Sequence, residues 1–145
     1  MAGQLVKQRE DLSISTTYWT QIFETLFMVS KSQAVRIEFT LVDTEIRNTS
    51  TTEMPGAQLL VKIGLNGPGQ NNEADAAQTI TYPDQNAPLG LDYTYTRQLF
   101  LPASGGTLTL APGHYLVTVQ VRGGTNSSAL VLTAAKAYLA ISGGG

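Results

Sequence analysis

The sequence predicts an all-β protein, an antiparallel β-sandwich or jelly roll with an extended N-terminal arm. Seven or eight segments are expected to be strands, the clearest of which alternate apolar and polar residues with a period of two, and the loops between them are rich in Gly, Pro, Asn and Asp. Only one segment shows a helical spacing, which disfavours a parallel sheet with crossover helices. We expect an arm over residues 1–14 and one β-sandwich or jelly-roll domain over residues 15–145.

Residues 1–14 differ from the rest of the chain. Four charged residues fall within positions 7–11, and the apolar residues between and around them follow no sustained period. We interpret this segment as an arm that lies on a neighbouring subunit, and a frayed terminus is the alternative. The arm hypothesis expects the core to fold without residues 1–14. The predicted partner contacts are Leu5, Val6, Leu12 and Ile14.

Residues 15–30 fit two structures. Apolar pairs begin at Tyr18, Ile22 and Leu26, and this four-residue spacing is typical of an amphipathic helix. The Thr and aromatic content of the same segment favours a strand instead. Both interpretations remain open, and either one places Trp19, Phe23 and Phe27 in the core.

The remaining elements are expected to be strands. Residues 34–46 alternate most clearly, with Val, Ile, Phe and Leu on one face and mostly polar residues on the other. Residues 58–65 are apolar enough to be buried on both faces. Further strands are expected over 78–82, 92–101, 107–110, 114–122 and 128–142. Pro112 and Gly113 supply the turn before the 114–122 strand.

Composition argues against several classes of function. The 145 residues carry a net charge of −2 and are only 14% charged, so we expect neither a nucleic-acid nor a membrane partner. The absence of Cys excludes disulfides, thiolate zinc sites and cysteine nucleophiles. The single His114 has no acidic residue within five positions, and no GxSxG motif or calcium-loop spacing occurs. We therefore expect no cofactor and no enzymatic activity.

Two tyrosines are candidates for ligand binding. Tyr93 and Tyr95 lie two residues apart in the expected 92–101 strand and so share one of its faces. An exposed tyrosine offers a flat stacking surface that loses little side-chain entropy on binding. A glycan is the ligand that this pair would suit, and packing within the sheet is the alternative.

The C-terminal quarter has a pattern found in jelly rolls. Residues 107–141 combine a short strand, a Pro-Gly turn, an alternating strand that begins near Tyr115, and a long closing strand. Together with the arm, the chain resembles the small decoration (cement) proteins of tailed-phage capsids. This resemblance implies a virion protein on the capsid surface that binds the major capsid protein and copies of itself, as a homodimer or homotrimer. The alternative is a tail- or fibre-associated module that binds a receptor glycan.

Overall fold

The computed structural model describes residues 3–15, 17–48, 57–72, 78–82, 92–101, 105–124 and 130–143. These residues form ten strands, and every strand pair is antiparallel. The strands are β1 (Gly3–Ile14), β2 (Thr20–Val29), β3 (Gln33–Asn48), β4 (Ala57–Gly67), β5 (Gln70–Asn72), β6 (Gln78–Tyr82), β7 (Asp92–Leu101), β8 (Leu108–Leu110), β9 (Gly113–Gly124) and β10 (Leu130–Gly143). The described residues contain no helix long and apolar enough to cross a membrane.

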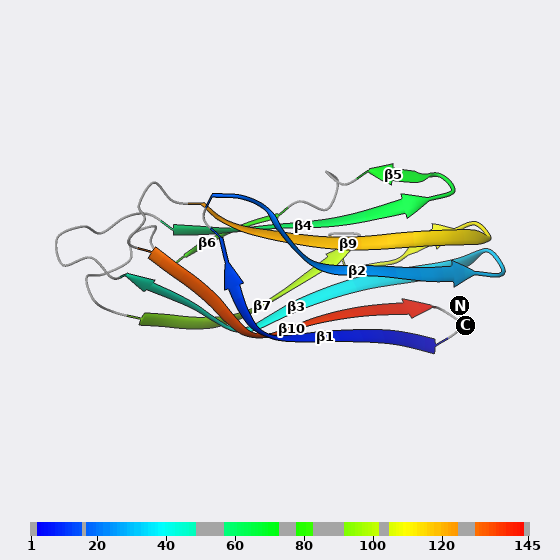
Figure 1. The fold of residues 1–145 in the computed structure, drawn as a ribbon. Coiled ribbons are helices and arrows are strands. Elements are labelled where there is room, and N and C mark those ends of the chain that lie inside the picture. The colour runs from blue at the N-terminus through cyan, green and yellow to red at the C-terminus, as the bar shows by residue number, and fades with distance from the viewer. Residues whose placement is uncertain are drawn as a thin grey trace.

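The strands form two five-stranded sheets that pack face to face (Figure 1). One sheet has the order β1-β10-β3-β7, with β8 also paired to β3. The other has the order β2-β9-β4-β5, with β6 also paired to β4. The predicted antiparallel β-sandwich is therefore confirmed. Gly3 pairs with Gly143, so the two ends of the chain lie side by side.

The core lies between the two sheets and follows the predicted alternation. In β3, Val35, Ile37, Phe39 and Leu41 are all buried, and the residues between them are half-buried. In the opposite sheet, β9 buries every odd residue from Tyr115 to Val121 in the same way. The edge of the Phe23 ring packs against Phe39 across the two sheets, with ring centroids 6.2 Å apart. Period-two burial thus explains why these segments become strands.

Residues 20–29 form a strand, which settles the ambiguity between helix and strand. The pairing of β2 with β9 shifts between Gln21 and Phe23, so one extra residue is inserted and both Ile22 and Phe23 are buried. After this bulge the burial alternates regularly to Val29. The bulge therefore accounts for the Ile22-Phe23 pair of the helical spacing, whereas in the Leu26-Phe27 pair one residue is exposed and the other buried. Phe23 and Phe27 lie in the core as predicted, whereas Trp19 is half-buried beside the strand.

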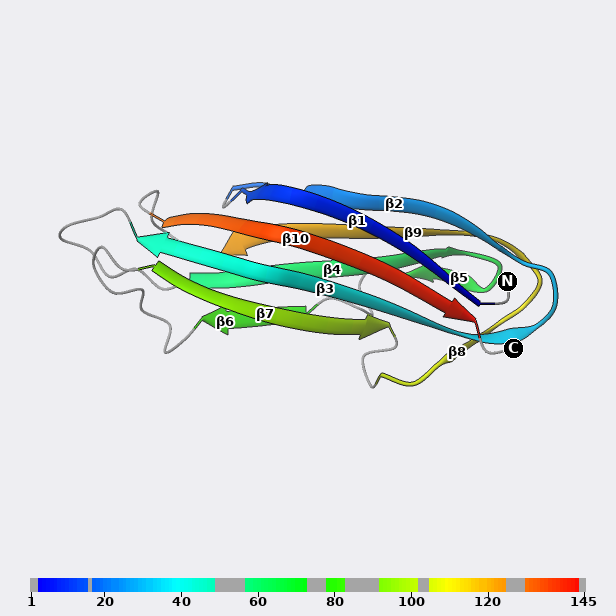
Figure 2. The ribbon, with the colours of Figure 1, turned by 90° about the horizontal axis from the view of Figure 1, so that it is seen from below.

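The N-terminal segment is a strand of the sandwich, which differs from the predicted arm. Residues 3–14 form β1 and pair with β10 from Gly3↔Gly143 to Ile14↔Leu132. The paired strand follows β10 along nearly its whole length (Figure 2). The backbone of β1 pairs with β10 along one of its two sides, so this segment does not extend away from the domain.

In the sheet that contains β1, β10 and β3, the alternation of inward and outward side chains shifts at the same position along these three adjacent strands. Asp11 in β1 and Asp43 in β3 have positive φ values of 52° and 51°, a backbone conformation that Asp tolerates better than most residues. Between these two strands, Ala135 and Lys136 of β10 are exposed in succession. Buried residues are even-numbered on one side of this level in β10 and odd-numbered on the other. Together, the three irregularities change which side chains of the sheet point toward the core.

Candidate interaction surface

Strands β1 and β2 form the open edge of the sandwich. Each is the terminal strand of its sheet in the described residues, so each offers backbone groups that no neighbouring strand uses. The two strands run along the same edge (Figure 2). Arg9 joins them, because its Nη1 donates a hydrogen bond to the carbonyl oxygen of Ile22 at 3.3 Å. We name β1, β2 and residues 15 and 17–19 between them the β1–β2 edge.

The four predicted contact residues have different surroundings. Leu12 and Ile14 are 4% and 5% exposed and belong to the core cluster, so a partner subunit cannot reach them without unfolding this edge. Leu5 is partly buried and packs against the same cluster. Val6 is 52% exposed and is the one member of the four whose side chain is free for a partner. The interface prediction therefore stays open for Val6, while Leu12 and Ile14 are core residues.

The exposed apolar side chains gather at the β1–β2 edge. Among the described residues, every large apolar side chain that is exposed lies on β1, on β2, between them, or on the neighbouring strand β10. These residues are Val6, Tyr18, Leu26, Met28 and Val131. A few exposed apolar residues are normal on a protein surface, but their confinement to one edge indicates a contact surface.

The sequence did not single out Leu26 and Met28, because residues 15–30 fitted both a helix and a strand. In the strand, Phe23, Thr25, Phe27 and Val29 face the core, so Leu26 and Met28 face outward. Residues 26–29 are all apolar, so hydrophobic alternation in the sequence could not have identified them.

A hollow of about 430 Å³ lies where β1 connects to β2. Tyr18 and Val131, both exposed, lie on its wall beside the buried side chain of Ile14. The main-chain amide groups of Thr17 and Tyr18 donate hydrogen bonds to the Ser15 hydroxyl oxygen, which holds residues 17 and 18 close to Ser15. The hollow therefore has an apolar wall held by a defined backbone.

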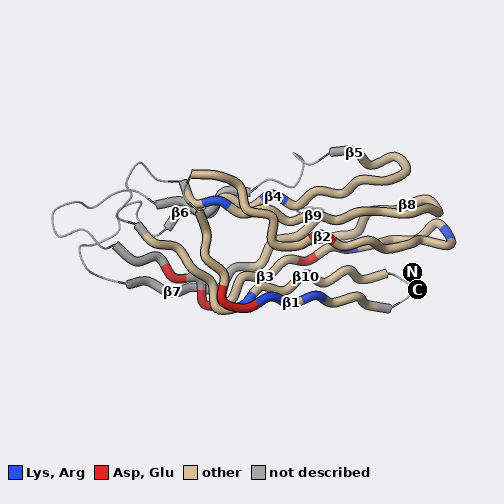
Figure 3. Tube along the Cα trace, in the orientation of Figure 1, with Lys and Arg blue, Asp and Glu red and all other residues tan. Residues whose placement is uncertain are grey.

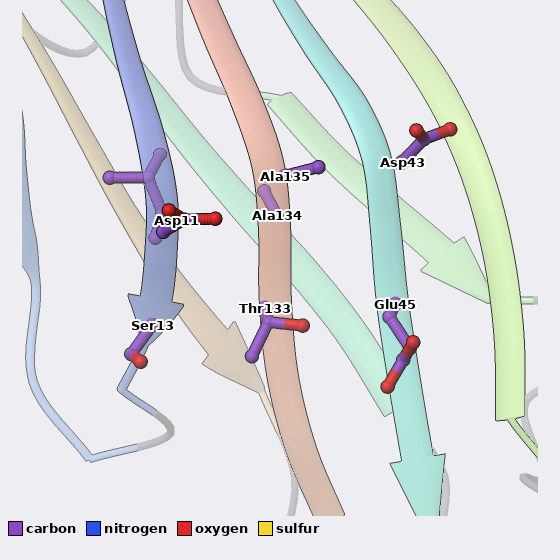
Figure 4. Close-up of a pocket in the computed structure, with 8 residues that line it drawn as sticks. Asp11, Ser13, Asp43, Glu45, Thr133, Ala134 and Ala135 are labelled. Carbon is purple, nitrogen blue, oxygen red and sulfur yellow. The ribbon is translucent and has the colours of Figure 1, made fainter.

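A second hollow of about 640 Å³ lies on the outer face of the sheet that contains β1, β10 and β3. It lies at the position along these strands where the side-chain alternation shifts. Asp11, Asp43 and Glu45 line it, together with Ser13 and Thr133 (Figure 4). Figure 3 shows acidic positions of β1 and β3 close together where these strands bend. No set of three or more His, Cys, Asp or Glu side chains in the described residues could hold a metal ion.

Two cations lie close to the ring of Trp19, the residue just before β2. The Lys62 Nζ is 4.5 Å and the Arg122 Cζ is 5.4 Å from the centroid of the Trp19 ring. Such contacts stabilise a fold by about 0.5–1 kcal/mol at exposed sites. The pair of cations therefore helps to hold the β1–β2 connection against β4 and β9.

The other predicted site residues lie elsewhere. The backbones of Tyr93 and Tyr95 are in β7, opposite Ile46 and Thr44 of β3, and their side chains lie outside the described residues. The glycan hypothesis for these two tyrosines stays a prediction. His114 is exposed near the start of β9, opposite Met28.

Neither a protein-family model nor a curated protein sequence matches this chain. Among solved structures, 98% of the chain aligns with 33% of the VP2 chain of an infectious bursal disease virus subviral particle, at 13% identity and a TM-score of 0.48. In T=1 particles derived from that virus, 98% of this chain aligns with 32% of the viral chain, at 14% identity and a TM-score of 0.48. In the Gx strain of the same virus, 98% of this chain aligns with 33% of the viral chain, at 14% identity and a TM-score of 0.44. This chain spans about a third of the length of each of these viral chains.

Proposed function

We propose that this protein is a structural component of a virion, bound to the outside of a capsid, and that it acts without catalysis. Its partners under this proposal are the major capsid protein and copies of itself. The observation that carries the proposal is the confinement of exposed apolar side chains to the β1–β2 edge and β10. A protein that acts by covering a surface needs exposed apolar side chains rather than a set of reactive groups.

The hollow between β1 and β2 is the part of this surface best suited to a shell. Tyr18 and Val131 offer an aromatic and an aliphatic side chain beside the hydrogen-bonded connection between β1 and β2. Burying such a side chain fully stabilises a contact by about 1.5–3 kcal/mol. Attachment of one oligomer at several points multiplies this effect, because the second contact forms at a high effective concentration.

The C-terminal strands also support the proposal. The short strand, turn, alternating strand and long closing strand typical of a jelly roll are present as β8, the turn before Gly113, β9 and β10. Low surface charge favours close packing on a repeated shell, since few charges must be desolvated.

The first test asks whether the chain is a virion component. Mass spectrometry of density-purified particles from the host that encodes the chain is expected to detect it at a constant ratio to the major capsid protein. Absence from purified particles would contradict the proposal.

The second test locates the contact. Purified protein is added to particles that lack it, and bound protein is measured by co-sedimentation. Replacing Tyr18 and Val131 by Asp is expected to weaken binding by about tenfold or more, because each Asp must be desolvated in the contact. The Gln8→Ala variant changes an exposed residue outside the hollow and serves as the control. Equal binding by both variants would argue against this surface.

The glycan alternative makes a different prediction. Binding to a glycan array that is lost in Tyr93→Ala but kept in the variant with Asp at positions 18 and 131 would favour the receptor-binding module.

A further inference from the structure

We propose that two copies of this chain associate through β2, in antiparallel register, about a two-fold axis at Leu26. The pairing would join the two β2-containing sheets into one continuous sheet. This inference rests on the proposed function, because it specifies how the proposed self-association would occur. The dimer is measured without any capsid, so the dimer and the capsid binding can each fail separately.

The free edge of β2 has a defined length. Its pairing with β9 is regular from Phe23↔Val119 to Val29↔Gly113, and the bulge lies just before this stretch. The carbonyl oxygen of Ile22, at the bulge, already accepts a hydrogen bond from Arg9. Seven residues, 23–29, therefore remain as a regular edge for another strand.

The register follows from this length. A strand that pairs with its own copy over all of residues 23–29 must have its two-fold axis at the middle residue, Leu26. Leu26 is 73% exposed, the highest value among the exposed large apolar residues described. The geometric centre of the free edge is thus also the side chain that gains most from being covered.

The neighbouring positions are compatible with the same axis. On the core side, Phe23 of one copy lies opposite Val29 of the other, and Thr25 lies opposite Phe27. On the outer side, Glu24 lies opposite Met28, whose side chain is 54% exposed. Glu24 is the one charged residue of residues 23–29, and this axis separates the two copies of Glu24 by about 13 Å along the strands. An axis at Glu24 would bring the two carboxylates face to face.

Strand β1 does not offer an equivalent edge. Lys7, Arg9, Glu10 and Asp11 place charge along it, and the positive φ at Asp11 bends its backbone. Charged and bent edge strands resist pairing with other chains. The contrast with β2 favours β2 as the pairing edge.

The mass of the protein in solution tests the association. Light scattering after size exclusion, at tens of micromolar protein, is expected to give twice the 15.5 kDa of one chain. Leu26→Lys and Leu26→Glu are each expected to weaken the dimer by about tenfold or more, because like charges meet at the axis. An equimolar mixture of these two variants is expected to restore a dimer that contains one copy of each. A monomeric wild type, a dimeric Leu26→Lys variant, or a mixture that stays monomeric would overturn the proposal.

Cysteine crosslinking tests the register. The chain has no Cys, so Leu26→Cys introduces one thiol per copy. Directly opposed residues in antiparallel strands have Cα atoms about 4.5–5.5 Å apart, which is within disulfide range. Mild oxidation is therefore expected to link Leu26→Cys into a covalent dimer. Met28→Cys is the matched control on the same face, because its two copies would be about 13 Å apart. Crosslinking of Met28→Cys as complete as that of Leu26→Cys would overturn the register.

Discussion

The two strands of the open edge occupy equivalent places and have opposite chemistry. β1 ends one sheet and β2 ends the other. β1 carries Lys7, Arg9, Glu10 and Asp11, and its backbone bends at Asp11. β2 carries one charge, Glu24, and is regular after its bulge. The difference shows how a sandwich can prevent other chains from pairing with one edge strand, β1, and leave the other edge strand, β2, available to a defined partner.

The comparison also separates sequence character from structural role. The more charged strand, β1, contributes Leu12 and Ile14 to the core, whereas the more apolar strand, β2, leaves Leu26 and Met28 in solvent. Charge density along a segment therefore does not indicate whether the segment is dispensable. The four predictions below test this conclusion, beginning with the largest expected effect.

Deleting residues 1–14 is expected to abolish folding. The deletion removes the partner strand of β10 and the core side chains of Leu12 and Ile14. Loss of either side chain alone costs about 2–5 kcal/mol, and domain stability is about 5–15 kcal/mol in total. Circular dichroism and thermal melting measure the outcome. A cooperative melt within a few degrees of the full chain would restore the interpretation of this segment as an arm.

The same substitution at the two edges is expected to have unequal effects. Leu12→Ala should lower the free energy of unfolding by about 2–5 kcal/mol, because it leaves a cavity in the core. Leu26→Ala should change the stability of the single chain by less than about 0.5 kcal/mol, because Leu26 is exposed there. Urea unfolding at low micromolar protein, where association contributes least, measures both. Similar losses in the two variants would mean that β1 and β2 do not differ as described.

Much of the fold could be predicted from the sequence because one-sided burial gives a period-two pattern. The bounds of β6 and β7 agree with the predicted strands over residues 78–82 and 92–101. β1 was missed because only Leu5 is partly buried before the positive φ at Asp11, and the full burial of alternate residues begins at Leu12. β2 was ambiguous because the bulge puts Ile22 and Phe23 on the same face. Local irregularities of the backbone therefore hid both edge strands.

The interaction surface was harder to predict than the fold. Val6 and Leu12 look alike in the sequence, and only the register of β1 on β10 decides that one is exposed and the other buried. Leu26 could be identified as exposed only after the strand and its bulge were known. Burial patterns on one strand depend on pairing with a distant strand, which a single sequence does not specify.

Substitutions at Asp11 are expected to show that the bend in β1 depends on its backbone conformation. Asp11→Val should lower the free energy of unfolding by about 1–2 kcal/mol, because a β-branched residue tolerates the positive φ poorly. Asp11→Gly should be neutral or change stability by less than about 1 kcal/mol, because Gly adopts this φ freely but is more disordered when unfolded. Urea unfolding compares the two variants. A Val variant as stable as the Gly variant would show that the bend does not require positive φ.

The smallest expected effect concerns the link between the two edges. Arg9→Ala removes the hydrogen bond from Nη1 to the carbonyl oxygen of Ile22 and should cost about 0.5–1.5 kcal/mol. Lys7→Ala is the matched control, since Lys7 is an exposed cation of the same strand, and it should change stability by less than about 0.5 kcal/mol. Both are measured by urea unfolding at constant ionic strength. Equal effects would mean that Arg9 contributes only charge. A loss of stability in Arg9→Ala alone would mean that the charged strand β1 stabilises β2. The reason is that a side chain of β1 donates a hydrogen bond to the backbone carbonyl group at which the free edge of β2 begins.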